Sequence, residues 1–120
     1  IIGAARANAE LAGVSELIEF RHQVVAELQR PAGFETGLVL SNPPYGERIG
    51  EQDELAVFYP QLGSALKKHW AGWNCFFFTA DLRLPKLVGL KPSRKTPLFN
   101  GPLECRLFEI RMVAGSNRKA

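Results

Sequence analysis

The sequence is poor in the residues that build metal sites and disulfide frameworks. Its 120 residues include only two cysteines, Cys75 and Cys105, and two histidines. The cysteines lie far apart, form no CxxC pair and have no histidine at ligand spacing, which argues against a zinc site. We expect two reduced, strand-embedded thiols in a cytoplasmic protein, with a single disulfide as the alternative.

Long apolar runs are also missing. No run approaches the ~18 residues that a membrane-spanning helix needs, so we expect no membrane association. The first residues show no basic segment followed by an apolar one, which argues against a signal peptide, and they include no initiator Met. From this start we expect a fragment or a processed chain. The net charge of +3 is compatible with a phosphate-bearing partner.

Hydrophobic spacing predicts helices and strands in alternation. The strand at 36–41 is a short apolar run, which suits burial on both faces, as in a parallel sheet. Apolar residues at 3-and-4 spacing predict the longest helix, at 53–70. The expected order is helix 1–12, strand 17–20, helical turn 24–28, strand 36–41, helix 53–70, strand 73–79, helix or turn 81–88, and strands 95–99 and 105–113.

This alternation predicts an α/β fold. The last two strands flank Asn100-Gly101-Pro102, which is typical of a hairpin turn, and they would add an antiparallel edge to the sheet. We expect residues 1–115 to form one partial domain and residues 116–120 to form a polar tail.

The strand at 36–41 leads directly into Asn42-Pro43-Pro44-Tyr45. Ligands of open α/β sheets bind beyond the carboxyl ends of the strands, where this loop falls. The two prolines fix φ near about −65° and lack amide donors, and Pro43 disfavours helical geometry at Asn42. We therefore expect a stiff loop that presents the Asn42 side-chain carbonyl and the Pro43 backbone carbonyl as acceptors.

Two acceptors beside a flat ring suit the exocyclic amine of a nucleobase. The acceptors can bind its two N–H groups, and Tyr45 can stack on the flipped base. This arrangement would direct the nitrogen lone pair towards an activated methyl group and favour the positive charge that develops there. The predicted catalytic residues are Asn42, Pro43, Pro44 and Tyr45; an inert turn is the alternative, because Asn-Pro and Pro-Pro occur in many turns.

Three stretches, LVLSNPPYGERIG, FYPQLGSALKKHWAGWNCFFFTAD and LFNGPLECRLFEI, resemble the RNA guanine-N2 methyltransferases that act on large-subunit ribosomal RNA. The resemblance runs from residue 3 through Val113. The extended NPPYGER form favours this RNA branch over the DNA adenine methyltransferases, which share only NPPY. It implies a class I, Rossmann-like S-adenosylmethionine enzyme, usually preceded by an RNA-binding THUMP domain. This chain would be the second half of its sheet, ending in the antiparallel hairpin.

The resemblance also implies a role for the residues that follow the loop. It puts Gly46, Glu47 and Arg48 at the lip of the base pocket, where Arg48 could meet RNA phosphate. A solvated ion pair between Glu47 and Arg48 is the alternative.

Two further positions carry expectations of their own. Arg94 and Lys95 form a small basic patch with Lys91 that could touch RNA, although a solvated strand edge would look the same. Asp81 follows a strand end, so we expect it near the rim of the site, capping the next helix.

For the cofactor, the resemblance implies contacts at Gln23, Val24 and Asn42. The family's glycine-rich loop and ribose-binding acidic residue would precede Ile1, so we expect the isolated chain to bind S-adenosylmethionine poorly or not at all. The family commonly carries an acidic residue where Val24 stands; Gln23 beside it could supply a polar contact to the adenine.

Other functions stay open at this point. The same loop chemistry would serve methylation of adenine N6 in DNA. A non-catalytic RNA-binding module that lost its cofactor is a rival from a different class. A homodimer through an exposed sheet edge is a further alternative, because an unpaired strand edge can pair with another chain.

Overall fold

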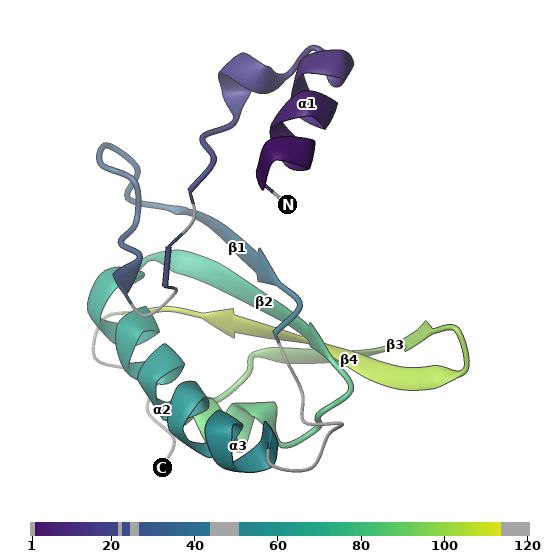
Figure 1. Ribbon diagram of the computed structural model, residues 1–120. Coiled ribbons are helices and arrows are strands. Elements are labelled where there is room, and N and C mark those ends of the chain that lie inside the picture. The colour runs from purple at the N-terminus through teal and green to yellow at the C-terminus, as the bar shows by residue number, and fades with distance from the viewer. Residues whose placement is uncertain (1, 22, 25–26, 44–50, 114–120) are drawn as a thin grey trace.

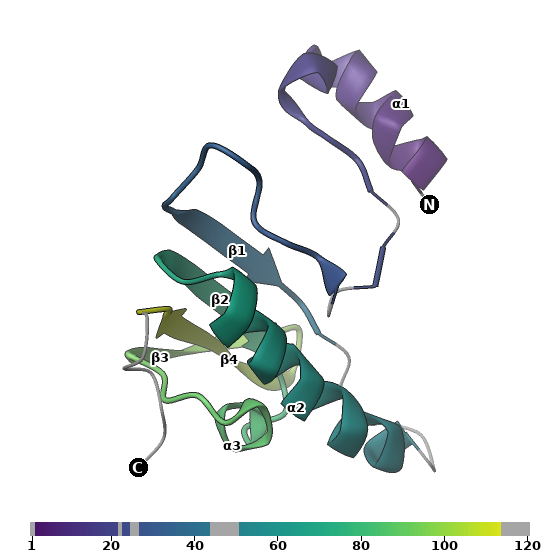
Figure 2. The same cartoon turned by 90° about the vertical axis from the view of Figure 1, so that its left-hand side faces the viewer.

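The computed structural model describes residues 2–21, 23–24, 27–43 and 51–113. It contains a four-stranded sheet with α2 and α3 on one face, while α1 stands apart from the sheet (Figures 1 and 2). The predicted α/β fold is therefore confirmed. Its elements are α1 (Ile2–Ala12), the 3-10 turn η1 (Ser15–Leu17), β1 (Gly37–Ser41), α2 (Glu51–His69), β2 (Trp73–Thr79), α3 (Leu84–Val88), β3 (Arg94–Asn100) and β4 (Leu103–Arg111).

The strands are arranged in the order β1-β2-β4-β3. β1 and β2 are parallel, with Val39 opposite Cys75, whereas β4 runs antiparallel to both β2 and β3. The predicted hairpin is confirmed: β3 and β4 are joined at Gly101, whose φ of +60° suits a residue without a Cβ. The last strand in sequence thus lies inside the sheet, and β3 forms its edge.

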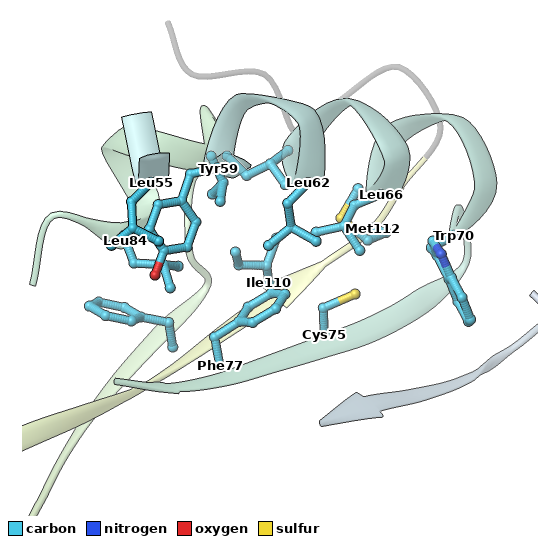
Figure 3. Packing of buried hydrophobic residues seen from close by; sticks show 13 residues of the cluster. Leu55, Tyr59, Leu62, Leu66, Trp70, Cys75, Phe77, Leu84, Ile110 and Met112 are labelled. Atoms are coloured by element: carbon cyan, nitrogen blue, oxygen red, sulfur yellow. The ribbon is translucent and has the colours of Figure 1, made fainter. Parts of the chain in front are cut away.

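The core lies between the sheet and α2 with α3 (Figure 3). Side chains of β2 alternate, so that Cys75, Phe77 and Thr79 are buried under the helices while Phe76 and Phe78 are half-buried on the other face. The apolar stripe of α2 packs onto this layer as its spacing predicts. The buried cluster contains Leu55, Tyr59, Leu62, Leu66, Trp70, Cys75, Phe77, Leu84, Val88, Leu90, Phe108, Ile110 and Met112.

Both cysteines are free and buried, Cys75 in β2 and Cys105 in β4. Their predicted position within strands is confirmed. Burial raises the pKa of the Cys75 thiol to about 12.

Helix α2 continues through Pro60 and approaches α3 closely at Gly63. Proline has no N–H, so the carbonyl four residues before Pro60 loses its hydrogen bond within the helix. Pro60 is exposed, so water can bond that carbonyl instead. A Cβ at Gly63 would collide with the backbone carbonyl oxygen of Val88. Gly63 therefore lets the two helices pack side by side on the sheet.

The strand predicted at 17–20 is wrong. Ser15–Leu17 form a 3-10 turn, and residues 18–20 take no regular structure. A strand is stabilised by the ladder of a neighbour, and among the described residues no strand runs beside this segment. Its apolar residues stay largely exposed, Leu17 at 84% and Ile18 at 44%.

The expectation that the 36–41 strand is buried on both faces is also wrong. β1 is an edge strand of the described sheet, and Leu38 and Leu40 are 58% and 70% exposed. Only Val39 packs against the core cluster. The apolar run gave the right element, but burial depends on the neighbours of the strand.

Two hydrogen bonds hold the segment before β1 against the end of α2. The Trp70 Nε1 donates to the Leu28 carbonyl at 3.2 Å, and the Arg30 guanidinium donates to the Ala71 carbonyl at 3.0 Å. These bonds hold the segment that leads into β1 and, after it, into the Asn42 loop.

No helix among the described residues is long and apolar enough to cross a membrane.

Candidate functional site

The candidate site begins where β1 ends. Ser41 is its last residue and pairs with Phe77, so Asn42 and Pro43 emerge at the carboxyl end of two parallel strands. Asn42 is exposed and its side chain makes no hydrogen bond within the described part of the chain, whereas Pro43 is buried. A buried ring anchors the loop while the adjacent amide stays available. Pro44, Tyr45, Gly46, Glu47 and Arg48 lie outside the described residues.

A mostly apolar hollow of about 300 Å³ adjoins Asn42 and Pro43. It lies between β1, α2 and the segment around Leu28, and its polar lining comes from few groups, among them Ser41 and Asn42. Water is held poorly against such walls, so a polar group that reached Asn42 would meet few competing partners. We call it the apolar hollow; it is lined by Leu28, Val39, Leu40, Ser41, Asn42, Pro43, Phe58, Leu62, Leu66, Trp70 and Phe77.

The neighbouring strand ends in a polar cluster of Thr79, Asp81 and Arg83. The Asp81 carboxylate accepts the Arg83 Nε and Nη2 hydrogens, both at 3.0 Å, and also the Arg83 backbone N–H. The hydrogen bond from the Arg83 side chain holds the pKa of Asp81 below its usual range. Thr79 Oγ1 in turn accepts the Asp81 backbone N–H.

This cluster corrects the expectation for Asp81. Its carboxylate accepts the backbone N–H of Arg83, the N-cap residue of α3, and α3 itself begins at Leu84 without a side-chain cap. Asp81 therefore positions the Arg83 guanidinium just after the carboxyl end of β2. Asn42 follows the carboxyl end of the parallel neighbour β1, so both residues lie at the carboxyl ends of the parallel strands.

Tyr59 belongs to the site region, although its place in the apolar stripe of the helix predicted at 53–70 indicates only a core residue. It is fully buried, and burial, followed by the charge of Asp81, raises the pKa of its phenol to about 12. The signal was present in the sequence: a tyrosine in the buried stripe of a helix needs a polar neighbour for its hydroxyl. Arg83, two positions after Asp81 in the sequence, was a weaker indication that this carboxylate has a cationic partner.

Gln23 and Val24 do not meet Asn42 in one hollow. Val24 is 63% exposed and lines a different depression, beside Lys68 and His69 of α2. The Gln23 side-chain amide donates to the Glu27 carbonyl at 3.4 Å. Among the described residues, Val24 and Asn42 thus line different hollows.

Arg94 and Lys95 point to opposite faces of β3, because neighbours on a strand alternate. Lys95 lines a depression beside α3, and Arg94 does not. A single contact surface therefore cannot use both side chains equally.

The described residues do not by themselves suit S-adenosylmethionine. Its ribose hydroxyls and its charged amino-acid end need polar or charged partners, and no side chain that lines the apolar hollow is charged. No group of three His, Cys, Asp or Glu side chains that could hold a metal ion occurs in the described ranges.

Comparison with known proteins gives consistent matches. Residues 1–109 match the family model for the RMKL-like methyltransferase domain. The curated "Ribosomal RNA large subunit methyltransferase K/L" of Syntrophotalea carbinolica is 44% identical over 111 residues. That match covers 91% of this chain and 16% of the relative, so the chain spans about a sixth of the relative's length.

Two solved structures share the architecture. SMU.472, solved in complex with SAH, matches with a TM-score of 0.82 and 25% identity over 92% of this chain and 29% of its own. A predicted N6-adenine-specific DNA methylase from Listeria monocytogenes matches with a TM-score of 0.76 and 30% identity, over 92% and 27% of the two chains. The sheet with α2 and α3 is therefore part of a Rossmann-like methyltransferase fold, as the sequence predicted.

Proposed function

Because the chain belongs to the RMKL-like methyltransferase domain family, we propose that its protein methylates an exocyclic amine of a nucleobase. The substrate we propose is guanine N2 in large-subunit ribosomal RNA, which the name of the Syntrophotalea carbinolica relative supports. One observation carries the proposal: Asn42-Pro43 leaves the carboxyl end of a parallel strand with the Asn42 amide exposed and the proline ring buried.

The two carbonyls hold the amine. One N–H of the base donates to Asn42 Oδ1 and the other to the Pro43 carbonyl oxygen, which fixes the direction of the nitrogen lone pair. Both oxygens carry partial negative charge and would favour the positive charge that develops on the nitrogen as the N–C bond forms and the S–C bond of the methyl donor breaks. The methylated amine would then lose one proton to solvent. Pro43 holds its carbonyl in place because its ring is buried.

Residues beyond the described part of the loop complete the proposed base pocket. Pro44 stiffens the chain, Tyr45 stacks on the base, and Gly46, Glu47 and Arg48 form the lip that meets RNA. Base–aromatic stacking of this kind contributes about 1–3 kcal/mol per base. The NPPYGER stretch of the sequence supports these roles.

We propose S-adenosylmethionine as the methyl donor of the full-length protein. The likeness to a structure that contains SAH supports this choice. Asn42 is the residue of the apolar hollow suited to contact the donor, and Val24 would reach its adenine from a separate hollow, with Gln23 next to it in the sequence. Further contacts must come from other residues, so titration calorimetry on the full-length protein should find micromolar binding. Absence of binding would favour the non-catalytic RNA-binding module.

Substitution of the loop amide tests the proposal most directly. Asn42→Ala in the full-length protein should reduce methyl incorporation into ribosomal RNA by on the order of 100-fold, because one acceptor of the amine is lost. Asn74→Ala makes the same change at an exposed position of β2 and should leave the rate unchanged. Full activity of a folded Asn42→Ala protein would contradict the proposal.

Adenine N6 in DNA is the second candidate substrate. The likeness to the Listeria monocytogenes protein supports it, since that protein is described as N6-adenine-specific. Parallel assays with guanine-containing RNA and adenine-containing DNA distinguish the two candidates. Methyl transfer to the DNA but not to the RNA would contradict guanine N2 as the substrate and favour adenine N6 in DNA.

Cellular location and self-association belong to the same proposal. Two free, buried cysteines support a reducing compartment, and we propose the cytoplasm. One edge of β1 pairs with no strand of the described ranges, and this edge, with exposed Leu38 and Leu40, supports a homodimer. Light scattering after size exclusion tests this, and a monomer at micromolar concentration would count against it.

A further inference from the structure

A second hollow, about 570 Å³ in volume, lies beside α3 and the start of β3. It shares no lining residue with the apolar hollow next to Asn42. Three lysines and one arginine line it, and we call it the lysine hollow. It is lined by Leu82, Arg83, Pro85, Lys86, Leu90, Lys91, Pro92 and Lys95.

The lysine hollow carries an uncompensated positive charge. Arg83 is paired with Asp81 through two hydrogen bonds. Lys86, Lys91 and Lys95 are exposed, and none forms an ion pair within the described ranges. Three like charges around one depression repel one another, and an anion placed between them relieves that repulsion.

The backbone that carries the three lysines is fixed by buried anchors. Lys86 lies between Leu84 and Val88, which are 0% and 3% exposed, and Lys91 follows the fully buried Leu90. The short turn between them is closed at Gly89, whose backbone N–H donates to the Pro85 carbonyl at 3.0 Å.

Lys95 is anchored from the other side of the hollow. The Ser93 backbone N–H and its hydroxyl both donate to the Glu109 carbonyl, at 2.7 and 3.1 Å, which ties the start of β3 to β4. Lysines on such a fixed backbone lose less conformational freedom on binding than lysines on a loose loop.

We propose that the lysine hollow binds the phosphate backbone of the RNA strand whose target base enters the Asn42 loop. The inference rests on the proposed function for the identity of the polymer. A backbone is favoured over a single phosphate because the three lysines come from three different segments, α3, the turn after it and β3, around one hollow of about 570 Å³. The Arg83 end of this depression follows β2, at the same sheet edge as Asn42, so one strand can reach both.

Salt-dependent binding tests the proposal. The full-length protein and its Lys86→Gln/Lys91→Gln/Lys95→Gln variant are titrated into a fluorescein-labelled 20-nucleotide RNA at 50 to 200 mM KCl. Loss of three phosphate contacts should weaken binding roughly tenfold at 100 mM and reduce the slope of log K against log salt by about 2. The loss should be similar for RNAs of different sequence, because phosphate contacts read no bases.

Matched controls separate this surface from general charge. Arg6→Gln/Arg21→Gln/Arg111→Gln removes the same charge from exposed positions on α1, on the segment after η1 and on β4 and should leave affinity and slope unchanged. An unchanged affinity and slope for the lysine-hollow variant would overturn the proposal. Equal competition by a poly-glutamate peptide would overturn the assignment to RNA.

The outcome is independent of the methyl-transfer assay. If Asn42→Ala abolishes transfer while the lysine-hollow variant binds RNA normally, only the present inference fails. If the full-length protein transfers no methyl group but the lysine-hollow variant loses RNA affinity, the proposed activity fails and the RNA surface stands.

Discussion

One face of the four-stranded sheet lies under α2 and α3, and the opposite face carries apolar side chains without such a cover in the described part of the chain (Figure 2). Phe77 on the covered face is 1% exposed, and Leu38 on the open face is 58% exposed. The two side chains come from adjacent strands of similar apolar character. The sequence of a strand determines how apolar the strand is, but the helices that pack on the sheet determine which of its faces is buried.

The strongest test of this comparison truncates one side chain on each face. Phe77→Ala should lower the free energy of unfolding by about 3–5 kcal/mol, because it opens a cavity under α2. Leu38→Ala, on the open face and 58% exposed, should cost less than about 0.5 kcal/mol. Urea unfolding measures both. Equal costs would mean that the open face is covered in solution, by a second copy or another part of the protein.

A smaller effect is expected where the covering helices touch. Gly63→Ala should destabilise by about 1–3 kcal/mol, because the added Cβ would collide with the Val88 carbonyl oxygen. Without this contact, alanine would stabilise the helix relative to glycine by up to about 1 kcal/mol. A loss of stability in Gly63→Ala would therefore show that α2 and α3 stay in contact at this position. Ser64→Ala, at the next and exposed position of α2, should be neutral or slightly stabilising. A stabilised Gly63→Ala protein would show that α3 can move away.

The covered face should also respond to alkaline pH. Burial raises the pKa of Cys75 from 9.0 to about 12, so the folded state prefers the neutral thiol. This contribution is complete below the unfolded pKa and is lost as pH rises from about 9 towards 12, by at most about 1.4 kcal/mol per unit. Cys75→Val should flatten the dependence between pH 8.5 and 10 in urea unfolding. Asn74→Val, on the open face, should keep the wild-type slope, and the same slope in both variants would contradict the assignment.

Much of the fold could be predicted because its signals are local. The strand at 73–79 and the hairpin around Gly101 follow from short apolar runs and a turn residue, and the structure confirms both. The helix predicted at 53–70 occurs as Glu51–His69. The failures, the strand at 17–20 and the two-sided burial of 36–41, concern partners that lie elsewhere in space. Local spacing contains no information about them.

The candidate site divides in the same way. The sequence predicts that Asn42 follows a strand end, and the structure has it there. The pairing of Asp81 with Arg83 is local, two positions apart, whereas the proximity of Tyr59 to Asp81 depends on how α2 crosses the sheet, so local spacing did not predict it. The catalytic roles of Asn42, Pro43, Pro44 and Tyr45 stay predictions.

The parallel pairing of β1 with β2 has a consequence for the order of folding. The β3–β4 hairpin closes over one tight turn, whereas β1 can join β2 only after the long crossover through α2 has returned the chain. Contacts between distant residues carry a larger loop-closure cost and form late. We therefore expect β1, the strand that leads into Asn42, to be the last to join the sheet. Pulse-labelled hydrogen exchange would refute this order if β1 amides were protected before those of the hairpin.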